Sequence, residues 1–393
     1  MQRLGLLQVA PVRQSTPTAS LEIIYDLKPL DLYIREMAVK TYVRLGIKPN
    51  WERQLGSLLK AHLHYLRQQV PEGCHQPLDN ITEIKVWKRP YKITIGDGMD
   101  TQLAHKSVLD FSCYTDGSLM DGKAGAGSLI LQRTKPWLTQ SVRMASGTVH
   151  QAELLAITNA AKLLAGETGK KILFLVDNQA SLKVLAGTNV KFDSVKTTRD
   201  ALHSLGSTNN VELRWIKAHV GHDGNEAADK AAKKGSTSNR GNQKPLLAKS
   251  KAWSLIDMQF RKTWETRWKG LKDHRQSKIF LHGPNKSNAS KLLHCQSEVV
   301  GRVARLLTGH AHMRRHQAVQ DQKTREPTGE INCRLCGEDD DETPAHIVCK
   351  CPALNSIRNI CMGTFQMDSY EPKWKMSGMI EFARIQEVKN LEE

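Results

Sequence analysis

The chain lacks any long apolar run, although hydrophobic residues make up 39% of its 393 positions. No segment approaches the roughly 18 consecutive apolar residues that a membrane-spanning helix needs. The first 14 residues hold only a short apolar patch and no cleavage-like site, so we expect no secretory signal. These absences predict a globular, soluble protein without a membrane partner, located inside the cell in the nucleus, the cytoplasm or both. The length leaves room for two or three domains.

Acidic residues are scarce relative to basic ones. There are 40 Asp and Glu against 57 Lys and Arg, which gives a net charge of +17. Residues 237–330 alone hold 19 basic and 7 acidic residues, an excess of 12 in under a quarter of the chain. Such a surplus favours a polyanionic partner, and we expect nucleic acid. A solvated basic surface is the alternative.

Evenly spaced cysteine pairs are also missing. Cys74, Cys113 and Cys295 stand alone, whereas four others crowd into 19 residues: Cys333, Cys336, Cys349 and Cys351. A crowded set with a histidine inside it indicates metal binding in a reducing compartment rather than a disulfide framework.

Four carboxylates are present where different elements can bring them to one point: Asp116, Glu153, Asp177 and Asp229. The first follows a β-type run and precedes a Gly-containing turn, and the second opens an apolar helical stretch. The third ends another buried run, and the fourth lies on a polar helix ten residues after His219. Gathered carboxylates repel one another unless a divalent cation neutralises them, and hard oxygen ligands suit Mg²⁺ or Mn²⁺. This is a ligand set for two-metal phosphodiester chemistry.

The periodicity around these acids predicts an α/β domain at residues 107–235. We expect strands at 108–115, 126–132, 140–146, 171–176 and 211–216, and helices at 151–165, 179–186, 194–206 and 224–234. Three leading strands followed by alternating elements predict a mixed five-stranded sheet with helices on both faces. Gly122, Gly125 and Gly127 predict a tight hairpin after the first strand.

At these positions the chain resembles the type 1 ribonuclease H family. The matching segments are 114–118 (YTDGS), 151–154 (QAEL), 176–179 (VDNQ), 215–222 (WIKAHVGH) and 225–229 (NEAAD). The resemblance implies a ribonuclease H-like fold that hydrolyses the RNA strand of RNA–DNA hybrids with two Mg²⁺ or Mn²⁺ ions. It implies that Asp116, Glu153, Asp177 and Asp229 hold the metals and that His219 moves protons or eases product release.

The resemblance also implies how the substrate is recognised. Gly117, Asn178 and Gln179 would contact the substrate, and the RNA strand would be distinguished by its 2′-hydroxyls. Some relatives carry a basic helical extension between their second and third helices. The 42 residues from Asp177 to His219 are too few for one. We therefore expect neighbouring segments to supply part of the grip on the hybrid.

Residues 1–105 carry no chemical motif, and residues 1 to about 67 alternate apolar with basic residues at helical spacing. A helix is expected over 29–45, with five apolar side chains mostly on one side: Leu32, Met37, Val39, Tyr42 and Val43. The stretch 81–95 is expected to be a loop or an edge strand. This whole region looks like the helical connector that follows the reverse transcriptase in polyproteins of non-LTR, jockey- or R1-like retrotransposons.

Residues 236–330 are expected to form a basic helical linker that begins with a Ser/Asn/Gly-rich stretch. Within 249–272, apolar side chains recur at helical intervals: Trp253, Ile256, Phe260 and Trp264. The favoured interpretation is an amphipathic helix that buries this stripe. The alternative is that Trp264 or Trp268 stacks on bases.

Residues 331–362 contain the pattern C-x2-C-x9-H-x4-C, formed by Cys333, Cys336, His346 and Cys351. Two thiolates and a later His/Cys pair can complete a closed zinc tetrahedron, which would be structural. Cys349 competes for the fourth position, and four reduced cysteines without metal are a further alternative. Cys351 is preferred because the segment resembles the C-terminal zinc knuckle of the same retrotransposon polyproteins, which is associated with nucleic-acid binding.

Taken together, the resemblance covers nearly the whole chain: connector, ribonuclease H, basic linker and knuckle. The polymerase palm of such polyproteins has no counterpart in the sequence, so it gives no support for reverse transcription by this chain alone. A second function of a different class stays open, namely a catalytically inactive nucleic-acid-binding remnant of a retrotransposon. The retention of all four acids and His219 favours the enzyme.

Overall fold

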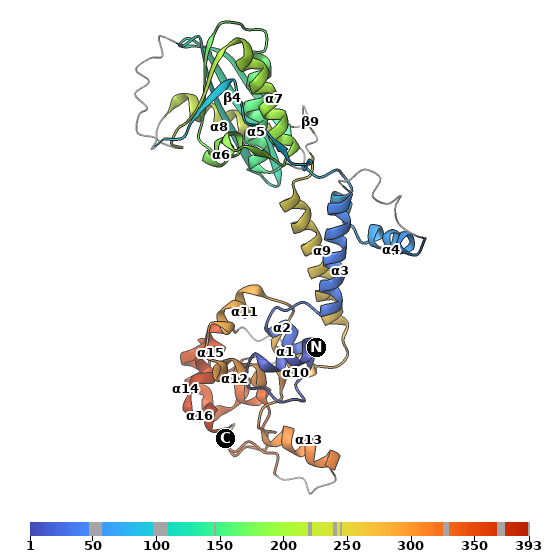
Figure 1. Cartoon of the computed structure of the whole chain (residues 1–393). Coiled ribbons are helices and arrows are strands. Elements are labelled where there is room, and N and C mark those ends of the chain that lie inside the picture. Colours follow the sequence, from blue (N-terminus) through green and yellow to red (C-terminus); the bar gives the residue numbers. More distant parts are fainter. Residues whose placement is uncertain are drawn as a thin grey trace. The chain divides into compact units, whose positions relative to one another are not determined.

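The structure is a computed structural model that describes residues 1–46, 57–96, 109–144, 147–218, 222–238, 242–243, 246–324, 330–367 and 374–391. The chain divides into two compact units, residues 39–256 and residues 1–38 with 257–393 (Figure 1). Among the described residues, none of the helices has the length and apolar character required to cross a membrane.

The first unit, 39–256, is built on a mixed sheet of seven strands in the order β2-β8-β6-β3-β4-β5-β9. Its five central strands are β3 (Phe111–Met120), β4 (Lys123–Gln132), β5 (Lys135–Met144), β6 (Lys171–Val176) and β8 (Asn210–Trp215). β3, β4 and β5 pair antiparallel, whereas β6 runs parallel to both β3 and β8. These five are the strands expected from the sequence. Two short edge strands extend the sheet, β2 (Tyr91–Thr94) and β9 (Asn242–Gln243).

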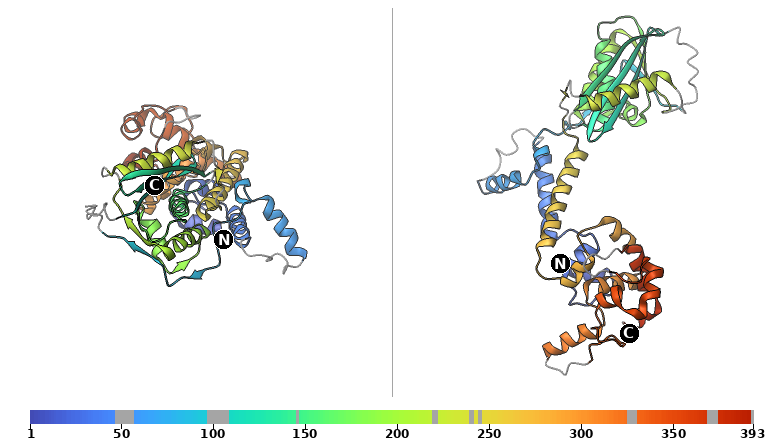
Figure 2. Two further views of the ribbon diagram at one scale, coloured as in Figure 1. Left: turned by 90° about the horizontal axis from the view of Figure 1, so that it is seen from above. Right: turned by 180° about the vertical axis from the view of Figure 1, so that it is seen from behind.

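Helices cover both faces of the sheet, as predicted (Figures 1 and 2). They are α5 (Val149–Leu163), α6 (Gln179–Ala186), α7 (Asp193–Thr208) and α8 (Asp223–Thr237). Side chains alternate along β6, because successive residues of a strand point to opposite faces. Phe174 joins the core beneath α5, α6 and α7, and Leu173 joins the core beneath α8. Burial on both faces explains why β6 reads as an unbroken apolar run.

Of the three glycines expected to form the hairpin turn after β3, only Gly122 does so. The turn is made by Asp121 and Gly122, which have φ of 48° and 75°. Gly125 and Gly127 instead lie within β4, where the backbone of α8 approaches. A Cβ added to Gly125 would be 2.2 Å from the carbonyl oxygen of Ala232. These two glycines therefore serve close packing between helix and sheet.

The first unit extends beyond the boundaries of 107 and 235 that the sequence suggested. The expected loop or edge strand at 81–95 contributes β2, which pairs parallel to β8, and β1 (Ile84–Lys85), which pairs antiparallel with β7 (Asn189–Val190). On the other side, Leu247 exchanges backbone hydrogen bonds with Pro77 and Asp79, at 2.9 and 2.8 Å. Segments before and after the central domain are thus tied together. α4 (Ser57–Gln68) also belongs to this unit.

The second unit, 1–38 with 257–393, is helical. Its elements are α1 (Gln2–Gln8), α2 (Thr18–Ile24), α10 (Arg275–Phe280), α11 (Lys286–Leu293), α12 (Ser297–Thr308), α13 (Arg314–Thr324), α14 (Asn355–Met362), α15 (Met376–Arg384) and α16 (Gln386–Asn390). α3 (Leu30–Leu45) and α9 (Lys249–Gly270) begin or end in this part of the chain.

The expected helix at 29–45 is present as α3, but its buried side is not fully as expected. Leu32 and Val39 are buried, whereas Met37 is 43% exposed. The neighbouring Glu36 is buried instead, because its carboxylate forms an ion pair with Lys28. Pairing removes the penalty that an isolated buried charge would incur.

The apolar stripe of α9 is buried at Ile256, Phe260 and Trp264, as favoured, whereas Trp253 is only partly buried. Phe260, Trp264 and Trp268 are each no more than 3% exposed. The indole Nε1 of Trp268 donates to the carbonyl oxygen of Leu281 at 2.9 Å. Base stacking by Trp264 or Trp268, the alternative interpretation, is therefore wrong, because neither ring has a free face.

Gly125→Ala should destabilise the first unit by about 1–3 kcal/mol, since the added methyl group would collide with α8 backbone. Gly166→Ala is the matched control, because a Cβ there has no neighbour within 4 Å. Urea unfolding of both variants checks this. Equal stability of the two variants would show that α8 does not pack this closely on β4.

Candidate functional site

Three of the four candidate acids meet at one end of the central strands. Asp116, Glu153 and Asp177 each offer a carboxylate oxygen, and these atoms lie within 4.8 Å of one another. The register explains why the two aspartates meet. Thr115 on β3 pairs with Val176 on β6, so the next residue of each strand carries its carboxylate to the same point. Asp116 lies inside β3, not in a turn after it as the sequence suggested.

Glu153 reaches this point because the start of α5 lies directly against β3. A Cβ on Gly117 would be 2.6 Å from the backbone nitrogen of Glu153, so only glycine allows this approach. The helix begins with a capping box in which Thr148 and Gln151 satisfy each other's backbone N–H groups. Gly117, expected to contact substrate, thus has a packing role as well.

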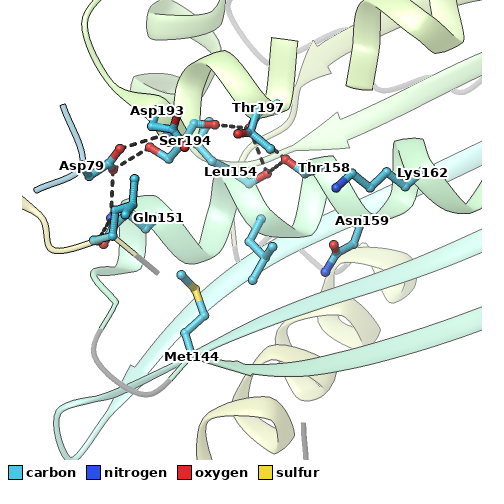
Figure 3. A pocket seen from close by; sticks show the side chains of 13 residues that line it. Asp79, Met144, Gln151, Leu154, Thr158, Asn159, Lys162, Asp193, Ser194 and Thr197 are labelled. Atoms are coloured by element: carbon cyan, nitrogen blue, oxygen red, sulfur yellow. Dashed lines mark hydrogen bonds between the residues drawn. The ribbon is translucent and has the colours of Figure 1, made fainter. Parts of the chain in front are cut away.

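Asp79 holds the start of α5 from outside the central domain. Its carboxylate accepts hydrogen bonds from Gln151 Nε2 at 2.8 Å and from the backbone N–H of Ser194 at 2.9 Å (Figure 3). Asp79 therefore joins the first turns of α5 and α7. It lines a pocket of about 230 Å³ on the side of α5 that carries Thr158 and Lys162.

Asp229, the fourth acid, lies outside the tight group. Its carboxylate accepts a hydrogen bond from Lys233 Nζ at 2.7 Å, one turn further along α8. It nevertheless acts on the group, because its charge and a hydrogen bond raise the pKa of Asp116.

The electrostatics of the group favour neutralisation. Burial, followed by the charges of Asp116 and Asp177, raises the pKa of Glu153 to about 9. Burial and the charges of Asp177 and Asp229 raise the pKa of Asp116 to about 7. Glu153 Oε2 is buried and has no hydrogen-bond partner among the described residues. An orphaned carboxylate oxygen beside two further carboxylates fits a hard divalent cation.

Asn225 lies at the site, although no role was expected for it from the sequence. It is 5% exposed, and its Nδ2 donates to Asp177 Oδ2 at 3.0 Å. Its spacing of four residues from Asp229 puts both on one side of α8, which is the signal that could have identified it. Trp215 Nε1 donates to the carbonyl oxygen of Asp177 at 2.9 Å, so this residue is held from two sides.

Three candidate residues remain: Asn178, Gln179 and His219. Asn178 caps α6 by accepting from the N–H of Ser181 at 3.2 Å, and its side chain also bonds Glu153, which lowers the pKa of that carboxyl. Gln179 is the first residue of α6 and is partly exposed. His219 lies outside the described residues.

The cysteine-rich segment forms a second cluster, in the helical unit. Ligand atoms of Cys333, Cys336, His346 and Cys351 all lie within 4.8 Å of one another. Cys333 Sγ is 3.9 Å from Cys351 Sγ, and Cys336 Sγ is 3.5 Å from His346 Nε2. A tetrahedral zinc with Zn–S bonds of about 2.3 Å places sulfurs about 3.8 Å apart, so the spacing fits.

The surroundings of this cluster bear on the choice of the fourth ligand. Cys349 is fully buried and is not in the group, so the geometry favours Cys351. His346 presents Nε2 to the sulfurs, while its Nδ1 lies 3.1 Å from an Asp340 carboxylate oxygen. This nitrogen forms no hydrogen bond among the described residues, so Asp340 does not fix the tautomer of His346.

Comparison with known proteins agrees with the first cluster. The family model for RNase H matches residues 110–237. The ribonuclease H of Neorickettsia sennetsu is 27% identical over 139 residues, covering 32% of this chain and 91% of that protein. The solved RNase H1 of the halophilic archaeon Halobacterium salinarum NRC-1 is 20% identical with a TM-score of 0.28, covering 32% of this chain and 96% of that one. The family-model match indicates an RNase H domain at residues 110–237.

Without metal, Glu153→Gln should stabilise the first unit, and more so at pH 8 than at pH 5. The folded pKa of about 9 exceeds the ordinary value of 4.5, so the folded state binds the extra proton and wild-type stability falls as pH rises between them. At about 1.4 kcal/mol per pKa unit, the gain should be about 1–4 kcal/mol larger at pH 8. Urea unfolding in chelator measures it.

Glu226→Gln on the exposed surface of α8 is the control for this substitution. Parallel pH profiles for wild type and Glu153→Gln would contradict the assigned electrostatics.

Proposed function

We propose that this chain hydrolyses the RNA strand of RNA–DNA hybrids with two divalent metal ions. The observation that carries the proposal is the convergence of three carboxylates at the carboxyl end of β6, within the region that the RNase H family model matches. Those of Asp116 and Glu153 are buried, and that of Asp177 is partly buried. The bacterial relative is named a ribonuclease H, which supports the same class of reaction.

Asp116, Glu153 and Asp177 are the residues that would hold the cations, with Asp229 contributing from α8. Mg²⁺ or Mn²⁺, when bound, would neutralise these carboxylates, make a water nucleophilic and stabilise the leaving oxygen. The protein's part is to fix the carboxylates in place. Asn225 and Trp215 restrain Asp177, and the approach of α5 over Gly117 restrains Glu153.

His219 is proposed to move a proton or to ease product release, and its position ten residues before Asp229 supports this. Gly117, Asn178 and Gln179 are proposed substrate contacts. The positions of Asn178 and Gln179, directly after Asp177 and at the start of α6, support this role.

The second cluster is proposed to hold a structural zinc through Cys333, Cys336, His346 and Cys351. Four protein ligands leave no open position, so this metal would stabilise the fold rather than react. Together with the basic excess of residues 237–330, the zinc-bearing segment is proposed to bind nucleic acid. The order of helical connector, nuclease, basic helices and knuckle supports an origin in a retrotransposon polyprotein.

An inactive nucleic-acid-binding remnant is the competing function. Incubation of the full chain with labelled hybrid and Mg²⁺ separates the two, because only the enzyme shortens the RNA strand. Cleaved RNA with intact DNA supports the proposal, and hybrid binding without any cleavage supports the remnant.

Asp116→Asn and Asp177→Asn should each abolish cleavage, by roughly a hundredfold or more, without lowering the melting temperature, because each removes a ligand and a repulsive charge. Asp121→Asn in the β3–β4 turn is the matched control, since its φ of 48° suits Asn and it lies outside the carboxylate group. Near-normal Mg²⁺-dependent cleavage by Asp116→Asn or Asp177→Asn would refute the metal assignment.

His219→Ala should slow turnover but leave residual activity.

Cys351→Ser should lose stoichiometric zinc, whereas Cys361→Ser should retain it, because Cys361 lies on α14 outside the cluster. Metal analysis of purified protein, with thiol titration before and after chelation, measures both. Zinc retained by Cys351→Ser and lost by Cys349→Ser would reassign the fourth ligand.

A further inference from the structure

A tryptophan stands exposed among basic residues just before β2. Trp87 is 74% exposed. Lys85, Lys88 and Arg89 beside it are exposed as well. A large aromatic side chain left in water among cations is unusual for a purely structural segment, because its burial would be favourable.

The backbone that carries Trp87 is fixed against the RNase H domain. Residues 81–86 run antiparallel to 188–191, with the N–H of Ile81 donating to the Lys191 carbonyl at 3.0 Å and that of Val86 donating to the Thr188 carbonyl at 2.9 Å. Val86 packs against the main core. Because successive residues of an extended chain point to opposite sides, this packing turns Trp87 outward.

The same pairing places Trp87 beside the end of α6 that lies away from Asp177. Its partner segment, 188–191, directly follows α6, and α6 begins two residues after Asp177. A helix of eight residues spans about 12 Å. β2, which follows Trp87, begins beside Val211 at the start of β8, whereas Asp177 follows the end of β6. The Trp87 segment therefore lies toward the other end of the sheet, several nucleotides from the candidate scissile position.

The charge of this surface suits a polyanion. Residues 83–92 and 183–200 together hold eight Lys and Arg and three Asp and Glu. Two of the acids are compensated, since Glu83 pairs with Lys191 at 3.5 Å and Asp200 pairs with Lys196 at 2.5 Å. Lys85 and Lys88 stay available for phosphates.

We propose that Trp87, Lys85 and Lys88 form a binding surface for the nucleic-acid strand that extends beyond the carboxylate group. The lysines contact phosphates, and the indole packs on the apolar face of a sugar or of an unpaired base. This inference rests on the proposed function for the identity of the substrate. It assigns part of the grip to a segment that precedes the RNase H domain in sequence.

The test is a binding measurement in the full chain carrying Asp177→Asn, so that it does not depend on cleavage. Labelled blunt hybrid, and hybrid with a single-stranded extension, are titrated at several salt concentrations. Trp87→Ala should weaken binding roughly five- to tenfold, and Trp87→Phe should restore most of it, because stacking tolerates any aromatic ring. Weaker binding to both probes indicates a sugar contact, and weaker binding to the extended probe alone indicates an unpaired base.

The double variant Lys85→Ser/Lys88→Ser should reduce the slope of log affinity against log salt by about two, one for each lysine that no longer neutralises a phosphate. Lys135→Ser is the charge control, because it is exposed on β5, which four strands of the sheet separate from β2. Unchanged affinity of Trp87→Ala on both probes, or an unchanged slope for the double variant, would overturn the inference. Absence of cleavage by the wild-type chain would instead overturn the proposed function and leave this result standing.

Discussion

The repulsion among buried carboxylates is the constraint on which the RNase H domain is built. Asp116, Glu153 and Asp177 come together because β3 and β6 are in register and because Gly117 lets the start of α5 lie against β3. Burying like charges costs free energy, which here takes the form of raised pKa values for Asp116 and Glu153. The packed sheet and the four covering helices hold an arrangement that the carboxylates alone would oppose, and a divalent cation would reverse the sign of the interaction.

The support for this arrangement extends beyond the matched region. Asp79 ties the first turn of α5 to that of α7, and β2 adds a parallel strand beside β8. Residues that precede the RNase H domain thus complete its sheet, fix the helix that carries Glu153 and present Trp87 to solvent. Of the segment expected to be a connector, residues 39–105 belong to the first unit, whereas residues 1–38 belong to the helical unit that also holds the cysteine cluster.

Much of the fold of the RNase H domain could be predicted from the sequence, because its strands and helices have strong hydrophobic periodicity. The positions of the candidate acids follow directly from these elements. Three details could not be predicted. Gly125 and Gly127 were expected to form a turn but pack against α8, because the close approach of a helix to a strand leaves no local sequence pattern. Glu36 replaced Met37 on the buried side of α3 because of an ion pair with Lys28, which lies eight residues away. The role of Asp79 depends on Gln151 and Ser194, which are distant in the chain, so spacing alone does not reveal it.

The raised pKa values of Glu153 and Asp116 mean that these carboxyl groups hold protons in the metal-free protein, and a divalent cation that binds between them would displace those protons. Calorimetric titration of Mg²⁺ into the metal-free chain at pH 7, repeated in buffers of different ionisation enthalpy, counts the protons released. With pKa values of about 9 for Glu153 and about 7 for Asp116, binding should release about one to two protons. The Glu153→Gln variant should release fewer. Mg²⁺ binding without proton release, or no Mg²⁺ binding at all, would contradict the account.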